Sequence, residues 1–430
     1  MARHPWVAAA DSGIRWGVQV VLGDGGLDRL RDVARLLEQL GYDGCFIFDH
    51  PALQPDPWMC LAALSSVTER VRLGSVVNCV PYRHPAVLAR VAADLDNLSN
   101  GRLMLGLGIG WLVPEFQAYD VPFLSPAERY RQLTEALKII PGAWGGEKFS
   151  FDGEMYRVRD LQISPAPVQR PRPPLMIGGS GENQTLRFVA EYADACNINE
   201  VSAVENRLQN TGGPEVVARK LDILRGHCEA VGRPYDEILR THFTIKTVVG
   251  KTDSAAAEKL EQLLAQPSTS PGTRRAHRSA FVFGAPETVA AHYRAIAQVG
   301  MQYFIVQVDS IDTETMELLA TEVAPHMETW RAAGIVDRQI FRRAGDLGPA
   351  VPDVHEPEAG GGVEVLVAVA VPDAAALAAH EHELGAVDGA HRCEAVPEAG
   401  AAEPLRVVHR PSVPGGAGRR LPLREPAAAT

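Results

Sequence analysis

The segment PPLMIGGSGENQTLRFVAEYADACN, which runs from Pro173 to Asn197, decides the fold class. A short apolar run ends in Gly178, Gly179 and Gly181, and apolar residues then recur with helical spacing before a second apolar run begins. The pattern predicts a buried strand, a tight turn, a helix and another strand. The glycines either make the turn and nothing more, or bring backbone N–H groups close to an anion at the helix N-terminus.

The same alternation continues along the chain in both directions. Strands are predicted at 15–22, 43–50, 71–78, 101–110, 239–249 and 301–308, and helices at 26–42, 57–70, 84–99, 126–144, 214–232 and 285–300. A hairpin around Asp152-Gly153 interrupts this rhythm. The strands are almost continuously apolar, which is typical of parallel strands that are covered on both faces.

This many strand–helix units in one chain predict an α/β fold, a TIM barrel of about 250 residues with insertions. A doubly wound open sheet is the alternative. That fold places its glycine fingerprint directly after the first strand, whereas the glycines here lie far from it.

Composition excludes several classes of protein. The chain has 430 residues and a formal net charge of −11, which argues against nucleic acid as a partner because phosphate binding needs a basic face. It contains no apolar run of about eighteen residues, so no membrane span is predicted. The N-terminus lacks the apolar core of a signal peptide, and the six cysteines show no CxxC spacing. We therefore expect a cytoplasmic protein with reduced thiols and no zinc site.

The character of the chain changes near residue 340. No aromatic residue follows Phe341, and Ala, Pro, Gly, Val and Glu dominate from there on. Without large side chains a stable core is hard to build. We expect an N-terminal extension at 1–13, the barrel domain at 14–340, and a C-terminal appendage at 341–430 that is partly disordered. A small α+β module is the alternative for the appendage.

In a barrel of this kind the chemistry lies at the carboxyl ends of the strands. The second predicted strand ends at Asp49-His50, the third at Asn78 and Cys79, and the fourth at Gly108, Gly110 and Trp111. The strand of the opening segment ends at Gly178–Gly181, and the next one ends at Asn197 to Glu200. Glycines at such ends allow a flat ring to lie against the backbone.

Three stretches carry a resemblance to a known family. The stretches GLGIGWLVPEFQAYDVPF, HPAVLARVAADLDNLSNGRL and PPLMIGGSGENQTLRFVAEYADACN resemble the bacterial-luciferase-like flavin and deazaflavin oxidoreductases, over about residues 14–336. The resemblance implies a TIM barrel with an insertion after the seventh strand, here roughly residues 266–284. The Phe48–His50 triplet FDH and the GGSGE turn look more like the members that use the deazaflavin coenzyme F-420. FMN is the alternative cofactor, and a homodimer is the expected assembly.

The resemblance also implies roles for individual residues. A histidine at the place of His50 lies beside the reactive ring and can pass protons. The family has a non-proline cis peptide at the place of Ser75-Val76, which bulges under the ring. Cys79 is not expected to be a nucleophile, because no base is implied nearby. The expected coenzyme contacts are the bulge and ring edge (Ser75, Val76, Asn78), a flat glycine wall (Gly108, Gly110), and a phosphate cradle at the start of a helix Glu182–Tyr192 (Gly178, Gly179, Ser180, Gly181, Glu182).

Four further residues are expected to face the substrate. Trp111 stands where the sugar-phosphate dehydrogenases of the family carry a catalytic glutamate, which puts glucose-6-phosphate chemistry in doubt. Glu200 follows a strand end. Arg274 and Arg275 lie in the expected insertion, where they hold the coenzyme tail or an acidic substrate, or belong to a solvated loop. Glu115 is interpreted as a solvated helix start.

The sequence thus predicts an oxidoreductase in which reduced F-420 exchanges a hydride with a small organic substrate and His50 handles the proton. An FMN-dependent monooxygenase that activates oxygen is one alternative. A flavin- or deazaflavin-binding protein without turnover is another, since ring binding needs the glycines but not His50.

Overall fold

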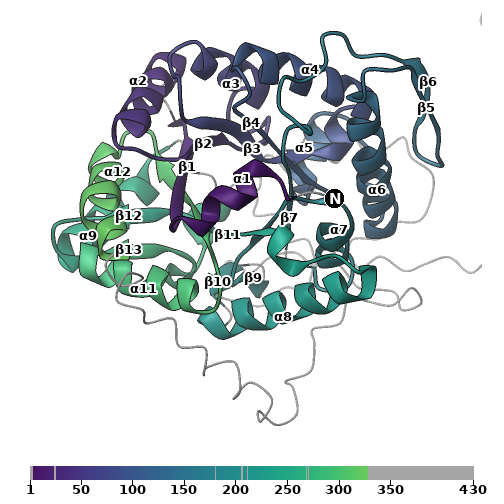
Figure 1. The fold of residues 1–430 in the computed structure, drawn as a ribbon. Helices are drawn as coiled ribbons and strands as arrows, with labels where there is room; N and C mark the ends of the chain where they lie inside the picture. Colours follow the sequence, from purple (N-terminus) through teal and green to yellow (C-terminus); the bar gives the residue numbers. More distant parts are fainter. Residues whose placement is uncertain are drawn as a thin grey trace, which may run out of the picture. The chain divides into compact units, whose positions relative to one another are not determined.

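The computed structural model describes residues 3–23, 26–179, 181–204, 207–210, 212–267, 269 and 271–327. Eight parallel strands close into a barrel in the order β1-β14-β11-β8-β7-β4-β3-β2, and helices surround it (Figure 1). The predicted TIM-barrel fold is confirmed. An open doubly wound sheet is excluded because β1 pairs with β14 over seven residues, from Arg15 opposite Tyr303 to Val21 opposite Asp309.

The barrel strands follow the expected apolar runs closely. They are β1 (Arg15–Val21), β2 (Gly44–Ile47), β3 (Arg72–Cys79), β4 (Leu103–Gly108), β7 (Leu175–Gly178), β8 (Ala195–Ile198), β11 (Leu239–Thr244) and β14 (Tyr303–Asp309). The helices between and after these strands are α2 (Gly26–Gln39), α3 (Pro57–Ser65), α4 (Pro85–Leu98), α5 (Val113–Ala118), α6 (Pro126–Ala143), α7 (Thr185–Tyr192), α8 (Gly213–Val231), α11 (Pro286–Gln298) and α12 (Thr313–Leu318).

The predicted N-terminal extension is part of the barrel. Helix α1 (Pro5–Ala8) places Trp6 against the ring of Tyr303, with 5.8 Å between ring centroids. The indole N–H of Trp6 reaches a carboxylate oxygen of Asp43 just before β2, and Arg15 at the start of β1 donates to the Trp6 carbonyl at 2.7 Å. All these contacts lie at the amino ends of strands, so this segment closes that end of the barrel.

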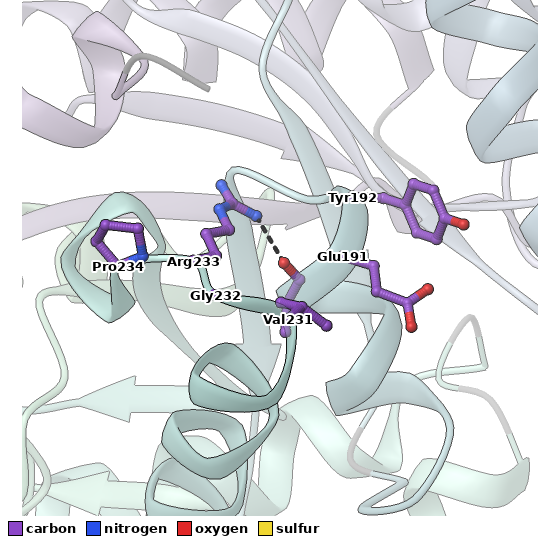
Figure 2. Close-up of a pocket in the computed structure, with 7 residues that line it drawn as sticks. Glu191, Tyr192, Val231, Gly232, Arg233 and Pro234 are labelled. Atoms are coloured by element: carbon purple, nitrogen blue, oxygen red, sulfur yellow. Dashed lines mark hydrogen bonds between the residues drawn. The ribbon is translucent and has the colours of Figure 1, made fainter.

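A shallow groove also lies at the amino ends of the strands (Figure 2). It runs between the end of α7 at Glu191 and Tyr192 and the turn from Val231 to Pro234 that follows α8. Across it Arg233 donates to the carbonyl of Ala190 at 3.2 Å. The groove therefore faces away from the strand ends at which chemistry is expected.

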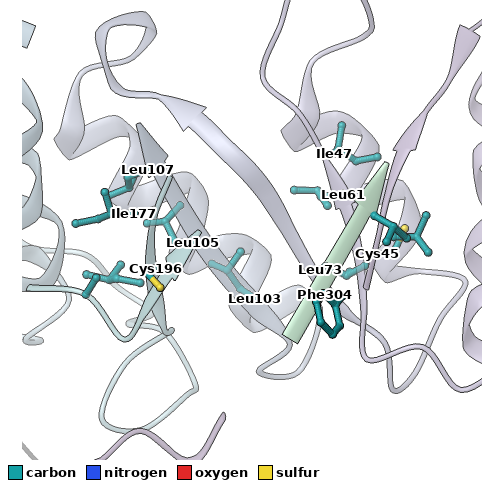
Figure 3. Close-up of a cluster of buried hydrophobic side chains, with 14 of the residues drawn as sticks. Cys45, Ile47, Leu61, Leu73, Leu103, Leu105, Leu107, Ile177, Cys196 and Phe304 are labelled. Carbon is teal, nitrogen blue, oxygen red and sulfur yellow. The ribbon is translucent and has the colours of Figure 1, made fainter. Parts of the chain in front are cut away.

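The main core lies between the strands and the helices (Figure 3). Side chains that point outward from the barrel, such as Cys45, Ile47 and Leu73, are fully buried there with Leu61 of α3. A second core fills the barrel itself, with Phe46, Met104, Met176, Tyr303 and Ile305 among its members. Because successive strand residues point to opposite faces, the two cores divide each strand between them.

Three insertions extend the barrel. The predicted hairpin around Asp152-Gly153 is confirmed as β5 (Phe149–Asp152) and β6 (Arg157–Leu161). The buried carboxylate of Glu135 on α6 holds its turn by accepting the backbone N–H groups of residues 154, 155 and 156. A second hairpin, β9 (Val201–Val204) and β10 (Arg207–Asn210), follows the sixth barrel strand.

The insertion after the seventh strand is longer than predicted. It begins not at residue 266 but at β12 (Thr247–Val249), and continues through α9 (Asp253–Ala265) and α10 (Pro271–Arg275) to β13 (Val282–Gly284). The stretch 239–249 was expected to form one strand. Lys246 interrupts it with a φ of +52°, a left-handed conformation that ends β11 and sends the chain into the insertion.

The expected appendage at 341–430 lies outside the described residues. Among the described helices, none is both long and apolar enough to cross a bilayer. Cys45, Cys60, Cys79, Cys196 and Cys228 are buried free thiols.

Candidate active site

His50 forms a close hydrogen bond to a carboxylate just after β2. Its Nδ1 lies 2.7 Å from Oε2 of Glu115, the acidic residue in the first turn of α5. Glu115 is 1% exposed, so the interpretation of this residue as a solvated helix start is wrong. The His50 side chain keeps 23% of its surface open, and the described residues provide no hydrogen-bond partner for its Nε2.

Two further donors hold the Glu115 carboxylate in place. The backbone N–H of Ala52 donates to Oε1 at 3.2 Å, and the hydroxyl of Tyr82 donates to Oε2 at 3.1 Å. Burial and the nearby carboxylate raise the pKa of Tyr82, so the phenol stays protonated as a donor. With three donors on one carboxylate, Nδ1 of His50 carries a hydrogen and Nε2 is left to exchange a proton.

The turn before His50 is fixed by a second charged group. Asp49 is buried and bonds to Arg83 at 2.7 Å and to the backbone N–H of Cys79 at 3.0 Å, while Arg83 also reaches Asp56 at 2.5 Å. Burial raises the pKa of Asp49, although Arg83 opposes that shift. Burial also raises the pKa of the Cys79 thiol well above its ordinary value, so Cys79 is not an activated nucleophile.

The bulge of β3 lies one residue later than predicted. The non-proline cis peptide joins Val76 to Val77 rather than Ser75 to Val76, and the pairing with β4 shifts between Ser75 and Asn78. The Val76 carbonyl accepts from the amide of Gln19 at 2.6 Å, and Gln307 donates to Gln19 at 2.7 Å. A chain of amides therefore supports the bulge from inside the barrel.

Asn78 and Ser75 do not face the barrel mouth. Asn78 is fully buried, and its amide nitrogen donates to the Gly106 carbonyl at 2.9 Å. Ser75 and Asn78 pair with Leu105 and Leu107, which point to the outer core. These two residues hold β3 to β4, while Val76 lies in the core of the barrel interior and Val77 packs against that core.

The glycines of β4 and β7 make room for Val77. A Cβ at Gly108 or at Gly178 would lie 2.6 or 2.7 Å from a Val77 methyl carbon. A Cβ at Gly110, where φ is +75°, would meet Cys79 and Phe116. The predicted bare glycine wall is therefore covered by side chains of β3 and α5.

The glycine-rich turn after β7 leads to a helix with an open N-terminus. Helix α7 begins at Thr185, three residues later than predicted, and Gln184 before it provides no side-chain cap. Gly179 has a φ of +132°, and a Cβ at Gly181 would lie 2.9 Å from the Tyr130 hydroxyl. Glu182 pairs with Arg219 at 2.6 Å, so its charge is neutralised beside the helix start. Ser180 lies outside the described residues.

Glu200 belongs to a buried cluster outside the barrel wall. Its Oε2 lies 2.5 Å from Nε2 of His242, its Oε1 accepts from Asn210 at 3.3 Å, and His292 of α11 approaches it at 3.7 Å. His242 contacts Phe304, a member of the outer core, so this cluster lies beneath α11. Glu200 therefore does not meet His50 at the mouth, contrary to its predicted place in the substrate site.

The cluster predicts a pH-dependent stability. Burial lowers the pKa of His292 to about 4, whereas an unfolded histidine titrates near 6.5. Between these values the unfolded chain binds a proton that the folded chain does not, so stability falls with decreasing pH by up to about 1.4 kcal/mol per unit. Urea unfolding between pH 7 and pH 5 should show this slope. His292→Asn, which cannot titrate, should lower the slope by the amount that corresponds to about one bound proton. An unchanged slope would contradict the assignment.

The remaining candidates lie apart from each other. Trp111 is 64% exposed and stands edge-to-face on His50, with 5.7 Å between ring centroids. Arg274 gives its donors to the carbonyls of Gln266, Pro267 and Thr269, which end α9 and its following loop. Arg275 lies beside it on α10. The arginine pair thus belongs to the insertion, and the structure does not bring it to His50.

The mouth also contains residues that the sequence analysis missed. Gln19 and Gln307 are inward-facing amides within otherwise apolar strands, and their polar character inside an apolar run is a usable signal. Tyr82 and Glu115 carried no such signal. Glu115 contacts Tyr82 and His50, which lie 33 and 65 residues away in the sequence.

Comparison with known proteins gives a consistent picture of the fold. The family model described as luciferase-like monooxygenase matches residues 12–303. The F420-dependent glucose-6-phosphate dehydrogenase of Microbacterium testaceum is 35% identical over 184 residues, 40% of this chain and 53% of that protein. The F420-dependent hydroxymycolic acid dehydrogenase of Mycobacterium tuberculosis is 35% identical over 177 residues, 39% of this chain and 48% of that protein. The chain thus spans about half the length of the curated relatives it matches.

Solved structures share the fold at low identity. The coenzyme F420-dependent tetrahydromethanopterin reductase of Methanopyrus kandleri superposes with a TM-score of 0.62 at 18% identity, covering 73% of this chain and 99% of that chain. A monooxygenase from Streptomyces bottropensis gives 0.62 at 21% identity, with the same coverage. An F420-dependent secondary alcohol dehydrogenase in complex with an F420-acetone adduct gives 0.62 at 16%, again with that coverage.

Proposed function

This chain belongs to the luciferase-like monooxygenase family, and from that premise we propose that it is an oxidoreductase that uses coenzyme F-420. It interconverts an alcohol and a carbonyl compound. The names of the F420-dependent relatives and of the secondary alcohol dehydrogenase support this choice. One observation carries it: a histidine at a barrel strand end is held through Nδ1 by a buried carboxylate, and no residue in the described part of the chain bonds to its Nε2.

The pair of His50 and Glu115 is suited to moving one proton. Glu115 fixes the imidazole so that Nε2 is the nitrogen that exchanges with the substrate. When an alcohol is oxidised, its hydroxyl proton passes to Nε2, and in the reverse direction Nε2 returns it to the carbonyl oxygen. Glu115 accepts the Nδ1 hydrogen throughout and so stabilises the protonated ring.

The residues at the mouth fit a deazaflavin coenzyme. When bound, the coenzyme supplies a ring carbon that accepts or donates a hydride. Val76 and Val77 offer an apolar surface on the bulge for one face of the ring. The uncapped start of α7 offers backbone N–H groups to a phosphate, and the small size of Gly181 keeps that approach open.

The proposal is tested by cofactor choice. Titration of the purified protein with F-420, followed by deazaflavin fluorescence, should give saturable binding, and an excess of FMN should not displace it. Tight FMN binding without F-420 binding would instead support an oxygen-activating monooxygenase. F-420 binding without turnover of any alcohol or ketone in a broad panel would support a binding protein.

The glycine turn gives a separate prediction. A Cβ at Gly181 would meet the Tyr130 hydroxyl at 2.9 Å and the Thr185 hydroxyl at 3.0 Å. Gly181→Ala should therefore disturb the helix start and weaken F-420 binding by about tenfold, the loss of one charged hydrogen bond. The matched control is Gly226→Ala in α8, where a Cβ meets nothing, and it should leave binding unchanged and stability equal or higher. Equal affinities for the two variants would place the phosphate elsewhere.

We also propose that the protein is a homodimer built through its barrel helices. Light scattering on the chain truncated after Phe341 should then give the same dimer mass as the full chain. A monomeric truncated protein beside a dimeric full chain would rule this out.

A further inference from the structure

We infer that the substrate is uncharged and, apart from its reacting group, apolar, and that Trp111 forms a wall of its site. The inference rests on the proposed function and names the substrate class. It depends on the side chains near Nε2 of His50 and on the partners of the cations nearby.

Four large apolar side chains on the two segments beside His50 are open to solvent. Leu53 is 42% exposed, Trp111 64%, Val113 37% and Tyr119 53%, and we call them the apolar rim. They lie on two segments, the turn after β2 and the start and end of α5. These segments are bonded to each other, because Ala52 donates to Glu115 and the Tyr119 hydroxyl donates to the Pro51 carbonyl at 2.9 Å.

Trp111 is the member closest to the chemistry. Its ring meets the His50 ring edge-to-face at an interplanar angle of 75°, while most of the indole remains open. An indole left this exposed contributes little to folding, but it gains free energy when a ligand covers it. Because Trp111 touches the proton-exchanging ring, a substrate in contact with His50 Nε2 lies within reach of the indole.

The cations near the rim are held in ion pairs or buried. Arg83 lies between Asp49 at 2.7 Å and Asp56 at 2.5 Å. Arg129 donates to the carbonyls of Gly110 and Leu124 and stacks on Phe123. At the far side of the mouth, Lys246 pairs with Asp309. An anionic substrate would reach Arg83 or Lys246 only by breaking an ion pair, and leaving a buried carboxylate such as Asp49 unpaired costs several kcal/mol. Arg129 has no carboxylate partner but is only 6% exposed.

These observations favour a hydrocarbon-bearing alcohol or ketone over a phosphorylated sugar. The reacting hydroxyl or carbonyl lies at His50, and the hydrocarbon part lies along the rim. A second protein copy could also cover the rim, but it would close the approach to His50. Because the side chain of His50 is exposed, a substrate is favoured over a second protein copy as the molecule that covers the rim.

The test measures affinity along a homologous series. Protein loaded with reduced F-420, which cannot accept a hydride from an alcohol, is titrated with butan-2-ol, hexan-2-ol and octan-2-ol by isothermal calorimetry, and with glucose 6-phosphate as the anionic probe. Each methylene buried on the rim is worth about 0.8 kcal/mol, so affinity should rise about fourfold per methylene. Trp111→Ala should flatten this rise, and glucose 6-phosphate should not bind.

The matched control is Leu98→Ala. Leu98 is 61% exposed, similar to Trp111, but lies at the end of α4, at the other end of the barrel. Leu98→Ala should leave the rise in affinity with chain length unchanged. Three results would each overturn the inference while leaving the F-420 proposal intact. Affinity could fail to depend on chain length, Trp111→Ala could show the same slope as the natural protein, or glucose 6-phosphate could bind tightly. If F-420 itself does not bind, the proposed function fails and the inference falls with it.

Discussion

Replacement of His50 by Asn is expected to slow turnover by roughly 10²–10⁴-fold, the usual contribution of a positioned acid–base group. The Asn amide can still donate to Glu115 in place of Nδ1, so the buried carboxylate keeps its partner. What is lost is the nitrogen that exchanges a proton with the substrate. The loss should appear in the chemical step, as slower single-turnover oxidation of reduced F-420 mixed with a ketone, while F-420 affinity changes little.

The same substitution elsewhere provides the control for His50→Asn. His84 caps the N-terminus of α4 by accepting the N–H of Ala86, and Asn is a favourable residue at that position. His84→Asn should leave single-turnover rates unchanged. If His50→Asn instead keeps its single-turnover rate and loses coenzyme affinity, His50 is a binding residue. Asn78 and Glu200 could not replace it as proton donor, because both lie away from the mouth.

Replacement of Glu115 by Gln is expected to reduce kcat by about 10²–10⁴-fold, as seen when an amide replaces the carboxylate that orients a catalytic histidine. A Gln amide that donates to Nδ1 would force the hydrogen onto Nε2, the opposite tautomer. KM and F-420 affinity should change much less, since Glu115 is buried and touches neither molecule. Steady-state kinetics with separate kcat and KM values measure this difference.

The control for Glu115→Gln is Glu128→Gln. Glu128 forms a capping box with Ser125 at the start of α6, and Gln serves this motif as well as Glu. This variant should keep full activity. If Glu115→Gln loses affinity and kcat together, or loses stability without a change in kcat, the carboxylate supports the fold and does not set the tautomer of His50.

Much of the fold could be predicted from the sequence because it depends on local patterns. Apolar runs located each barrel strand, and β1 and α6 differ from their predicted ranges by one residue at one end. The missed features depend on single dihedral angles or on packing. The left-handed conformation of Lys246 divides the stretch 239–249, which was predicted as one strand, into β11 and β12, and no residue type at that position signals it. The late start of α7 was missed as well, because Glu182 and its two successors are acceptable helix residues that form a turn instead.

The candidate site was predictable only where position along a strand decides it. His50 follows from the rule that strand ends face the mouth, and the cis peptide was missed by one residue. Glu200 illustrates the limit of that rule. Asn197 points inward beside Thr241, but β8 ends at Ile198, and the bend that follows turns Glu200 toward His242 outside the barrel. Glu115 was missed because an acidic residue in a first helical turn ordinarily stabilises the helix dipole from the surface. Its burial comes from His50 and Tyr82, which are distant in the sequence.

The packing of two strand-end glycines around Val77 also limits the order in which this sequence can evolve. Alanine at Gly108 or Gly178 would collide with a Val77 methyl carbon at 2.6 or 2.7 Å and would be selected against. If Val77 changes to alanine first, both methyl groups disappear, and the nearest remaining Val77 atom lies at 3.8 Å from a Cβ at Gly108 and 3.5 Å from one at Gly178. Replacement of Val77 first therefore allows a later alanine at either glycine, whereas alanine at a glycine first would collide with Val77. Lineages with alanine at either glycine position should carry a small residue in place of Val77.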